Sequence, residues 1–70
     1  MTAEPDLYDI LEVATHARPA VIDAAFAVLR EHAARAEDDG AVRMLVELNR
    51  AHAVLADPDR RAAYDLDRVR

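Results

Sequence analysis

Three consecutive carboxylates, Glu37, Asp38 and Asp39, form the densest group of potential metal ligands in the sequence. A calcium loop of the EF-hand type needs alternating oxygen ligands over about twelve residues, with a bidentate glutamate at the end, and that pattern is absent here. Gly40, the single glycine, follows the acidic run, and glycine after polar residues is typical of a turn. We therefore expect a solvated acidic loop and predict no metal site.

The three histidines offer little more chemistry. His16, His32 and His52 are not spaced from one another like a pair of zinc ligands. His52 falls within a helical pattern, where we expect a residue at the edge of the core with one hydrogen-bonded ring nitrogen. The alternative for His52 is a role in sensing pH.

Cysteine and serine are both absent, which excludes a disulfide, a thiolate nucleophile and a Ser-His-Asp triad. Seventy residues also give no obvious cleft for a pair of catalytic carboxylates. We predict that the protein is not an enzyme and needs no cofactor.

The net charge indicates which classes of partner the protein can bind. The net charge is −5, and the basic residues are all arginine. Nucleic-acid binders carry a concentrated basic patch, so we predict no nucleic-acid partner and disfavour a DNA-binding helix-turn-helix. No apolar run approaches the roughly 18 residues of a membrane span, and the first residues lack a secretion signal. We expect no membrane partner and a cytoplasmic location.

The elements that position these residues are helical. Alanine is frequent and β-branched residues are few, which favours an all-α domain. Residues 1–5 are expected to be a frayed end. The pattern predicts a short helix from the N-cap Asp6 to about Val13, long helices over 19–35 and 41–56, and a closing helix that starts at Pro58 after the N-cap Asp57.

Both long helices carry an apolar stripe at the spacing of a buried face. Such a pair, joined by a short loop, should pack antiparallel. The closing helix is expected to turn Ala62 and Tyr64 or Leu66 inward. The predicted core positions are Ile22, Ala25, Phe26, Leu29 and Ala33 on the first long helix, and Ala41, Met44, Leu45, Leu48, His52 and Leu55 on the second.

Three segments carry a family resemblance. "DLYDILEV", "VIDAAFAVL" and "LNRAHAVLADPDRRAAYD" occur in this order and without a gap in spacing. They resemble the first helix, the second helix and the end of the third helix with the following Asp-Pro turn of the J-domain (DnaJ) family. The resemblance covers residues 6–67 and implies a J-domain-like fold, an antiparallel hairpin flanked by a short N-terminal and a short C-terminal helix.

The resemblance also implies where the family's function would lie. J-domains stimulate ATP hydrolysis by a DnaK-type chaperone through a His-Pro-Asp triplet between the two long helices. The matching positions hold Ala34, Arg35 and Ala36, and His32 lies two residues too early. The motif is therefore degenerate in this chain.

The basic outer face of the family's second helix is missing as well. Positions that usually hold lysine or arginine read Asp23, Ala24, Ala27 and Val28, and Arg30 is the main basic residue left. Attraction to an acidic chaperone surface depends on that charge. We therefore disfavour a DnaK-type chaperone as the partner.

Apolar residues take the place of the charges. Val21, Ala24 and Val28 form a second stripe on the first long helix, and Val42, Val46 and Ala53 do so on the second. One interpretation is a slightly apolar surface without a function. The other is a stripe or groove that binds a partner protein, another domain or a second copy of the chain.

We predict a non-catalytic J-like interaction or scaffolding module that does not stimulate a DnaK-type ATPase. The alternative is a co-chaperone that engages a DnaK-type chaperone in a non-standard way, through Arg30, Arg35 and Arg43 around the loop.

Overall fold

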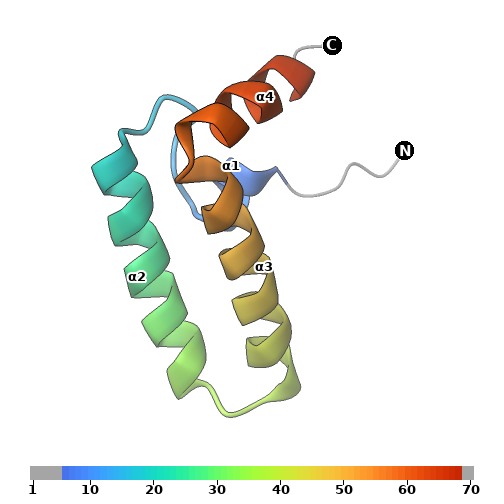
Figure 1. Cartoon of the computed structure of the whole chain (residues 1–70). Coiled ribbons are helices and arrows are strands. Elements are labelled where there is room, and N and C mark those ends of the chain that lie inside the picture. The colour runs from blue at the N-terminus through green and yellow to red at the C-terminus, as the bar shows by residue number, and fades with distance from the viewer. Residues whose placement is uncertain (1–5, 69–70) are drawn as a thin grey trace.

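The computed structural model describes residues 6–68, so the end predicted to fray, residues 1–5, lies outside the described residues. Within 6–68 the chain forms four helices and no strand, which confirms the all-α fold. None of these helices is long and apolar enough to cross a membrane. The helices are α1 (Leu7–Ile10), α2 (Pro19–Arg35), α3 (Asp39–Leu55) and α4 (Pro58–Arg68) (Figure 1).

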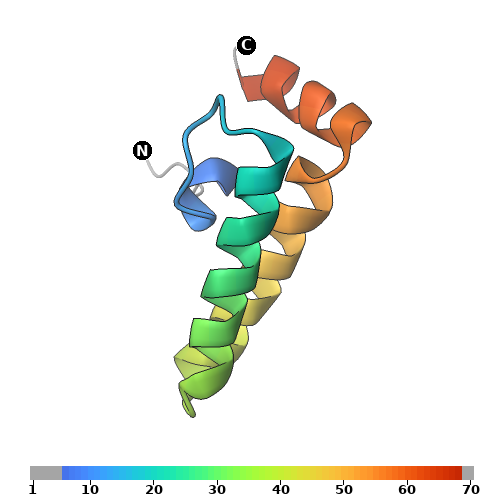
Figure 2. The ribbon, with the colours of Figure 1, turned by 90° about the vertical axis from the view of Figure 1, so that its left-hand side faces the viewer.

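Helices α2 and α3 form an antiparallel hairpin with its loop at one end of the molecule (Figure 1). We call this loop end, residues 33–41, the tip, and the opposite end, where α1 and α4 lie, the head. Figure 2 shows α1 against one face of the hairpin and α4 across the head. No other helix of the described chain covers the opposite face along the lower half of the hairpin.

The core runs from the head down the inside of the hairpin. Helix α2 begins as predicted at Pro19, where a missing N–H costs nothing, and Arg18 before it makes no side-chain cap. The buried apolar residues that form one cluster are Leu7, Tyr8, Leu11, Ile22, Ala33, Leu48, Ala51 and Leu55.

Met44 is a correction to the predicted core. Its side chain is 46% exposed, whereas Ala51, which the sequence did not single out, is fully buried. Helix α1 is only four residues long, and Met44 lines an open hollow beside Ile10 instead of lying under that helix.

Helix α1 also ends earlier than predicted, at Ile10 instead of about Val13. Glu12 adopts a left-handed conformation, with φ of 57°. This residue reverses the chain so that the amide of Val13 donates to the carbonyl of Tyr8 at 3.0 Å. The turn brings Val13 against the core.

Helix α3 begins two residues earlier than predicted, at Asp39 instead of Ala41. The Asp38 carboxylate accepts the backbone N–H of Ala41 at 2.8 Å and caps the helix. Gly40 therefore lies in the first turn of α3 and does not interrupt the helix. A Cβ atom at Gly40 would lie 3.2 Å from the capping oxygen of Asp38, so glycine leaves room for the cap.

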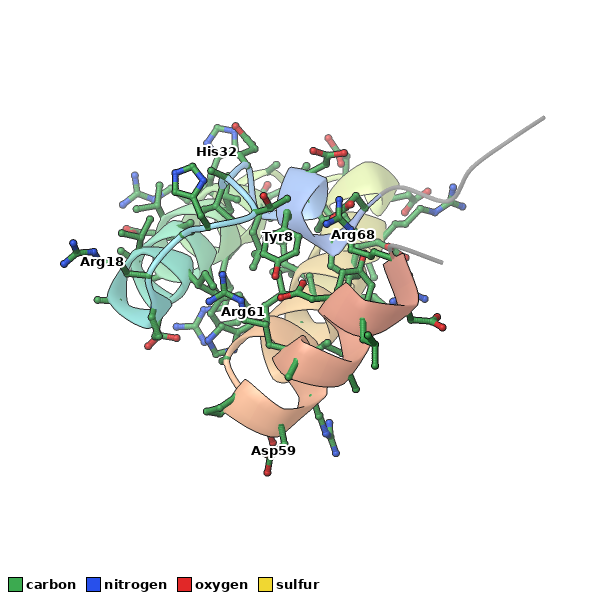
Figure 3. The ribbon with its side chains drawn as sticks, turned by 90° about the horizontal axis from the view of Figure 1, so that it is seen from above. Tyr8, Arg18, His32, Asp59, Arg61 and Arg68 are labelled. Carbon is green, nitrogen blue, oxygen red and sulfur yellow. The ribbon has the colours of Figure 1, made fainter. Side chains whose placement is uncertain are left out.

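Helix α4 has no buried residue. Its backbone lies against α3, and its side chains make polar contacts to residues of α1. The hydroxyl of Tyr8 donates to Asp65 at 2.5 Å and accepts from Nε of Arg61 at 3.0 Å. Figure 3 shows Arg61 and Arg68 on either side of Tyr8 at the head, each with its guanidinium over the ring. Burial raises the pKa of Tyr8 above its usual value of 10.0, and the hydrogen bond to Asp65 raises it further.

Two further bonds join the ends of the described chain. The Tyr64 hydroxyl accepts the backbone N–H of Leu7 at 3.0 Å, and Arg68 is ion-paired with Asp6. Tyr64 packs against the core as predicted. Ala62 is exposed, so its predicted inward position was wrong. Of the two alternatives Tyr64 and Leu66, Tyr64 is the one that turns inward.

Candidate functional site

The tip holds the positions where the resemblance places the His-Pro-Asp triplet. Ala34 and Arg35 lie in the last turn of α2, and Ala36 is its C-cap. Nη2 of Arg35 donates to Oε1 of Glu31 at 2.6 Å, one helical turn back, and both side chains are exposed. The three positions therefore offer two methyl groups and a guanidinium that is already paired.

His32 does not stand in for the missing histidine. It is part of α2 and exposed, and it borders a shallow hollow formed with Val28, Glu31 and Arg35. The side chain belongs to the flank of the helix instead of the loop. Figure 3 shows His32 apart from Arg61 and Asp59 of α4.

A hollow at the tip was not predicted. It has a volume of about 380 Å³ and lies between the end of α2 and the start of α3. The buried alanines Ala33 and Ala41 form its floor. The full lining is Ala33, Ala34, Ala36, Glu37, Asp38, Asp39, Ala41, Val42 and Leu45. We call it the tip hollow.

The carboxylates that line the tip hollow are not paired with a basic side chain within residues 6–68. Within residues 6–68, Glu37, Asp38 and Asp39 take part in no ion pair. Asp38 uses one oxygen to cap α3, and Asp39 lies in the first turn of that helix. No group of three acidic or histidine side chains in the described part of the chain is arranged to hold a metal ion.

The apolar stripes are exposed, as the sequence predicted. The exposed fractions are 48% for Val21, 65% for Val28, 63% for Val42 and 61% for Val46. Ala24 and Ala53 are exposed as well.

The two stripes do not lie on one face of the hairpin. Leu29 of α2 and Met44 of α3 line one hollow with Ile10, which marks the face that α1 covers. Phe26 of α2 stacks on His52 of α3 at 4.0 Å between ring centroids, which marks the other face. Successive residues turn by about 100° along a helix. Val21 and Val28 therefore lie beyond Leu29 on the α1 face. Val42 lies beyond His52 on the opposite face and Val46 points away from α2, so the two stripes do not form one groove.

The outer surface of α2 shows what replaces the family's basic residues. Asp23 is hydrogen-bonded to Nε2 of His52 at 2.9 Å. This confirms the prediction that one ring nitrogen of His52 is hydrogen-bonded. Ala24, Ala27 and Val28 are exposed. Positions that would attract an acidic partner therefore present a carboxylate and aliphatic groups.

The three arginines of the alternative function are not gathered together. The guanidinium of Arg30 lies 5.4 Å from the centre of the Phe26 ring. Arg35 is paired with Glu31, and Arg43 lines the hollow on the α1 face. They do not form a joint basic patch around the loop.

The hollow on the α1 face is the second feature that the sequence did not predict. Its volume is about 330 Å³. It opens because α1 stops at Ile10 and leaves part of the hairpin uncovered. Its lining is Ile10, Glu12, Leu29, Gly40, Arg43, Met44, Glu47 and Leu48.

Comparisons with known proteins agree with the fold described above. Residues 6–65 match the DnaJ domain family. A chaperone protein DnaJ of Methanosarcina thermophila is 36% identical over 67 residues, which cover 93% of this chain and 17% of that relative. The chain thus spans less than a fifth of the relative's length. Since the family match extends over most of the chain, the protein belongs to the DnaJ domain family.

Proposed function

We propose that this chain is a J-domain-fold protein interaction module that does not stimulate a DnaK-type ATPase. The main support is the tip, where Ala34, Arg35 and Ala36 provide no imidazole, no rigid proline turn and no free carboxylate. The missing basic face of α2 adds to it, because a partner with an acidic surface would not be attracted to Asp23 and its aliphatic neighbours.

The partner that we propose is another protein or protein domain, which includes a second copy of this chain. The module performs no catalysis of its own and binds neither nucleic acid nor membrane, in keeping with its net charge of −5. We place it in the cytoplasm, a prediction that rests on the sequence.

A single-turnover ATP hydrolysis assay with a DnaK-type chaperone tests this function. A J-domain with an intact His-Pro-Asp triplet serves as the positive control. We expect this chain to leave the hydrolysis rate at its basal value. Acceleration comparable with that of the positive control would disprove the proposal.

Two grafted variants show which missing part matters. One carries Ala34→His, Arg35→Pro and Ala36→Asp, and the other adds Asp23→Lys and Ala27→Arg on α2. We expect acceleration from the second variant only, because the contact needs both the triplet and the long-range attraction. Circular dichroism checks that both variants remain helical.

A co-chaperone function is the second candidate, and family membership favours it, because the relative from Methanosarcina thermophila is named as a chaperone protein DnaJ. On this view a DnaK-type chaperone is engaged through contacts other than the triplet. Binding without acceleration in the same assay, detected by competition with the positive-control J-domain, would support this second candidate.

A further inference from the structure

We propose that the tip hollow is the docking site for a basic amphipathic helix of a partner protein. The inference rests on the proposed function, since it names the kind of partner that the interaction module takes. It concerns the face of the hairpin opposite α1, which no other helix of residues 6–68 covers along its lower half (Figure 2).

The floor of the hollow suits a single aliphatic side chain. Ala33 and Ala41 are buried, and Leu45 is half-buried. A volume of about 380 Å³ remains open above them, because four of the lining residues are alanines. A leucine or isoleucine placed there would gain apolar burial without displacing any side chain of this chain.

The rim determines the charge of the partner. Glu37, Asp38 and Asp39 line the hollow beside the apolar floor, and none of them is ion-paired within the described chain. The neighbouring Arg35 is bonded to Glu31 and is not paired with any of them. Lysine or arginine beside the aliphatic anchor would complement these carboxylates, whereas an acidic segment would be repelled.

The stripe on α3 determines the shape of the partner. Val42 lines the hollow, and Val46 is exposed one helical turn further on the same face. A helix that places its anchor in the hollow would lay its next apolar residues over these valines, which is the usual helix-in-groove arrangement. The tip is negatively charged, so it would repel an acidic chaperone surface and attract a basic partner.

Synthetic peptides of about 14 residues test the proposal. One peptide combines leucines at i, i+3, i+4 and i+7 with lysines, and a matched peptide has glutamate in place of each lysine. Each is titrated into the 15N-labelled 70-residue chain while amide chemical shifts are followed. We expect the basic peptide to shift the amides of residues 33–46 first, and the acidic peptide to shift none.

Three variants separate the apolar contribution from the charge. Val42→Asp adds attraction for lysine but spoils the apolar contact, and we expect binding about tenfold weaker. Val28→Asp makes the same charge change on the other face, where binding should be unchanged. The double variant Glu37→Gln with Asp39→Asn should weaken binding by about two- to fivefold.

Several results would overturn the proposal. These are equal binding of the acidic peptide, shifts centred outside residues 33–46, no binding at all, or binding that Val42→Asp leaves unchanged or tightens. None of them bears on the ATPase assay, so a failure of this inference is distinguishable from a failure of the proposed function.

Discussion

Glu12 is a residue in a backbone conformation that its type disfavours. It is the only non-glycine residue of the described chain with a positive φ. A side chain with a Cβ atom costs about 1 kcal/mol in this conformation, because Cβ approaches the following carbonyl oxygen. The position is retained because the turn delivers Val13 to the core.

Glu12→Gly should therefore raise the free energy of unfolding by about 1 kcal/mol, since glycine adopts a positive φ without the steric cost. Urea denaturation followed by circular dichroism measures the change. Glu12→Ala is the control, because it removes the carboxylate and keeps the Cβ atom. An equal gain from the alanine variant would assign the effect to charge instead of backbone strain.

At the scale of single residues, the sequence predicted the roles of those residues whose side chains bond to nearby backbone groups. Asp6 and Asp57 accept backbone N–H groups at the starts of α1 and α4, as their types at those positions indicate. The sequence did not predict the left-handed turn at Glu12, because glutamate gives no signal for that conformation. The length of α1 was overestimated for this reason.

The boundaries of the elements depend on competition between neighbouring residues. Gly40 was interpreted as a helix breaker, yet it lies in the first turn of α3. The cap formed by Asp38 outweighs the low helix preference of one glycine. Propensity alone could not predict this, because the outcome depends on which of three acidic residues becomes the cap.

Asp38→Ala should lower the free energy of unfolding by about 1 kcal/mol, because the N–H of Ala41 loses its side-chain acceptor and keeps only the backbone carbonyl of residue 38. Glu37→Ala is the matched control and should leave stability nearly unchanged, since the carboxylate of Glu37 caps nothing. Urea denaturation gives both values. An equal loss in the two variants would show that general charge at the tip, and not the cap, stabilises α3.

The exposed side of each long helix was predictable from the sequence, but the orientation of the two helices relative to each other was not. Periodicity correctly predicted that Val28 and Val46 would be exposed. It could not show that the two stripes form no common groove, because the rotation of α2 relative to α3 is set by contacts such as the stacking of Phe26 on His52. The tip hollow was missed for a similar reason, since it arises only where two helix ends meet.

At the scale of the whole molecule, Tyr8 links the first helix to the last. Its hydroxyl contacts Asp65 and Arg61, residues more than fifty positions away in the sequence. The raised pKa of Tyr8 means that the folded state favours the protonated phenol. This contribution to stability is complete below the usual pKa of 10.0 and is lost as the pH rises above it.

We therefore expect the free energy of unfolding to fall above about pH 10. Tyr8→Phe should be less stable at neutral pH, because Asp65 and Arg61 lose a partner, but its stability should decline less steeply above that pH. Urea denaturation from pH 8 to 11 measures both effects, with the range chosen to bracket a usual tyrosine pKa of about 10. Parallel pH profiles for the two proteins would contradict this account.

The ion pair between Asp6 and Arg68 has an architectural consequence. It holds the first and last described residues side by side, so a polypeptide could enter and leave this fold at a single point. Such a unit can be inserted into a surface loop of a host protein without separating the two halves of that loop. Helix α2, with 17 residues, would then act as a rigid arm that carries the acidic tip about 25 Å from the host.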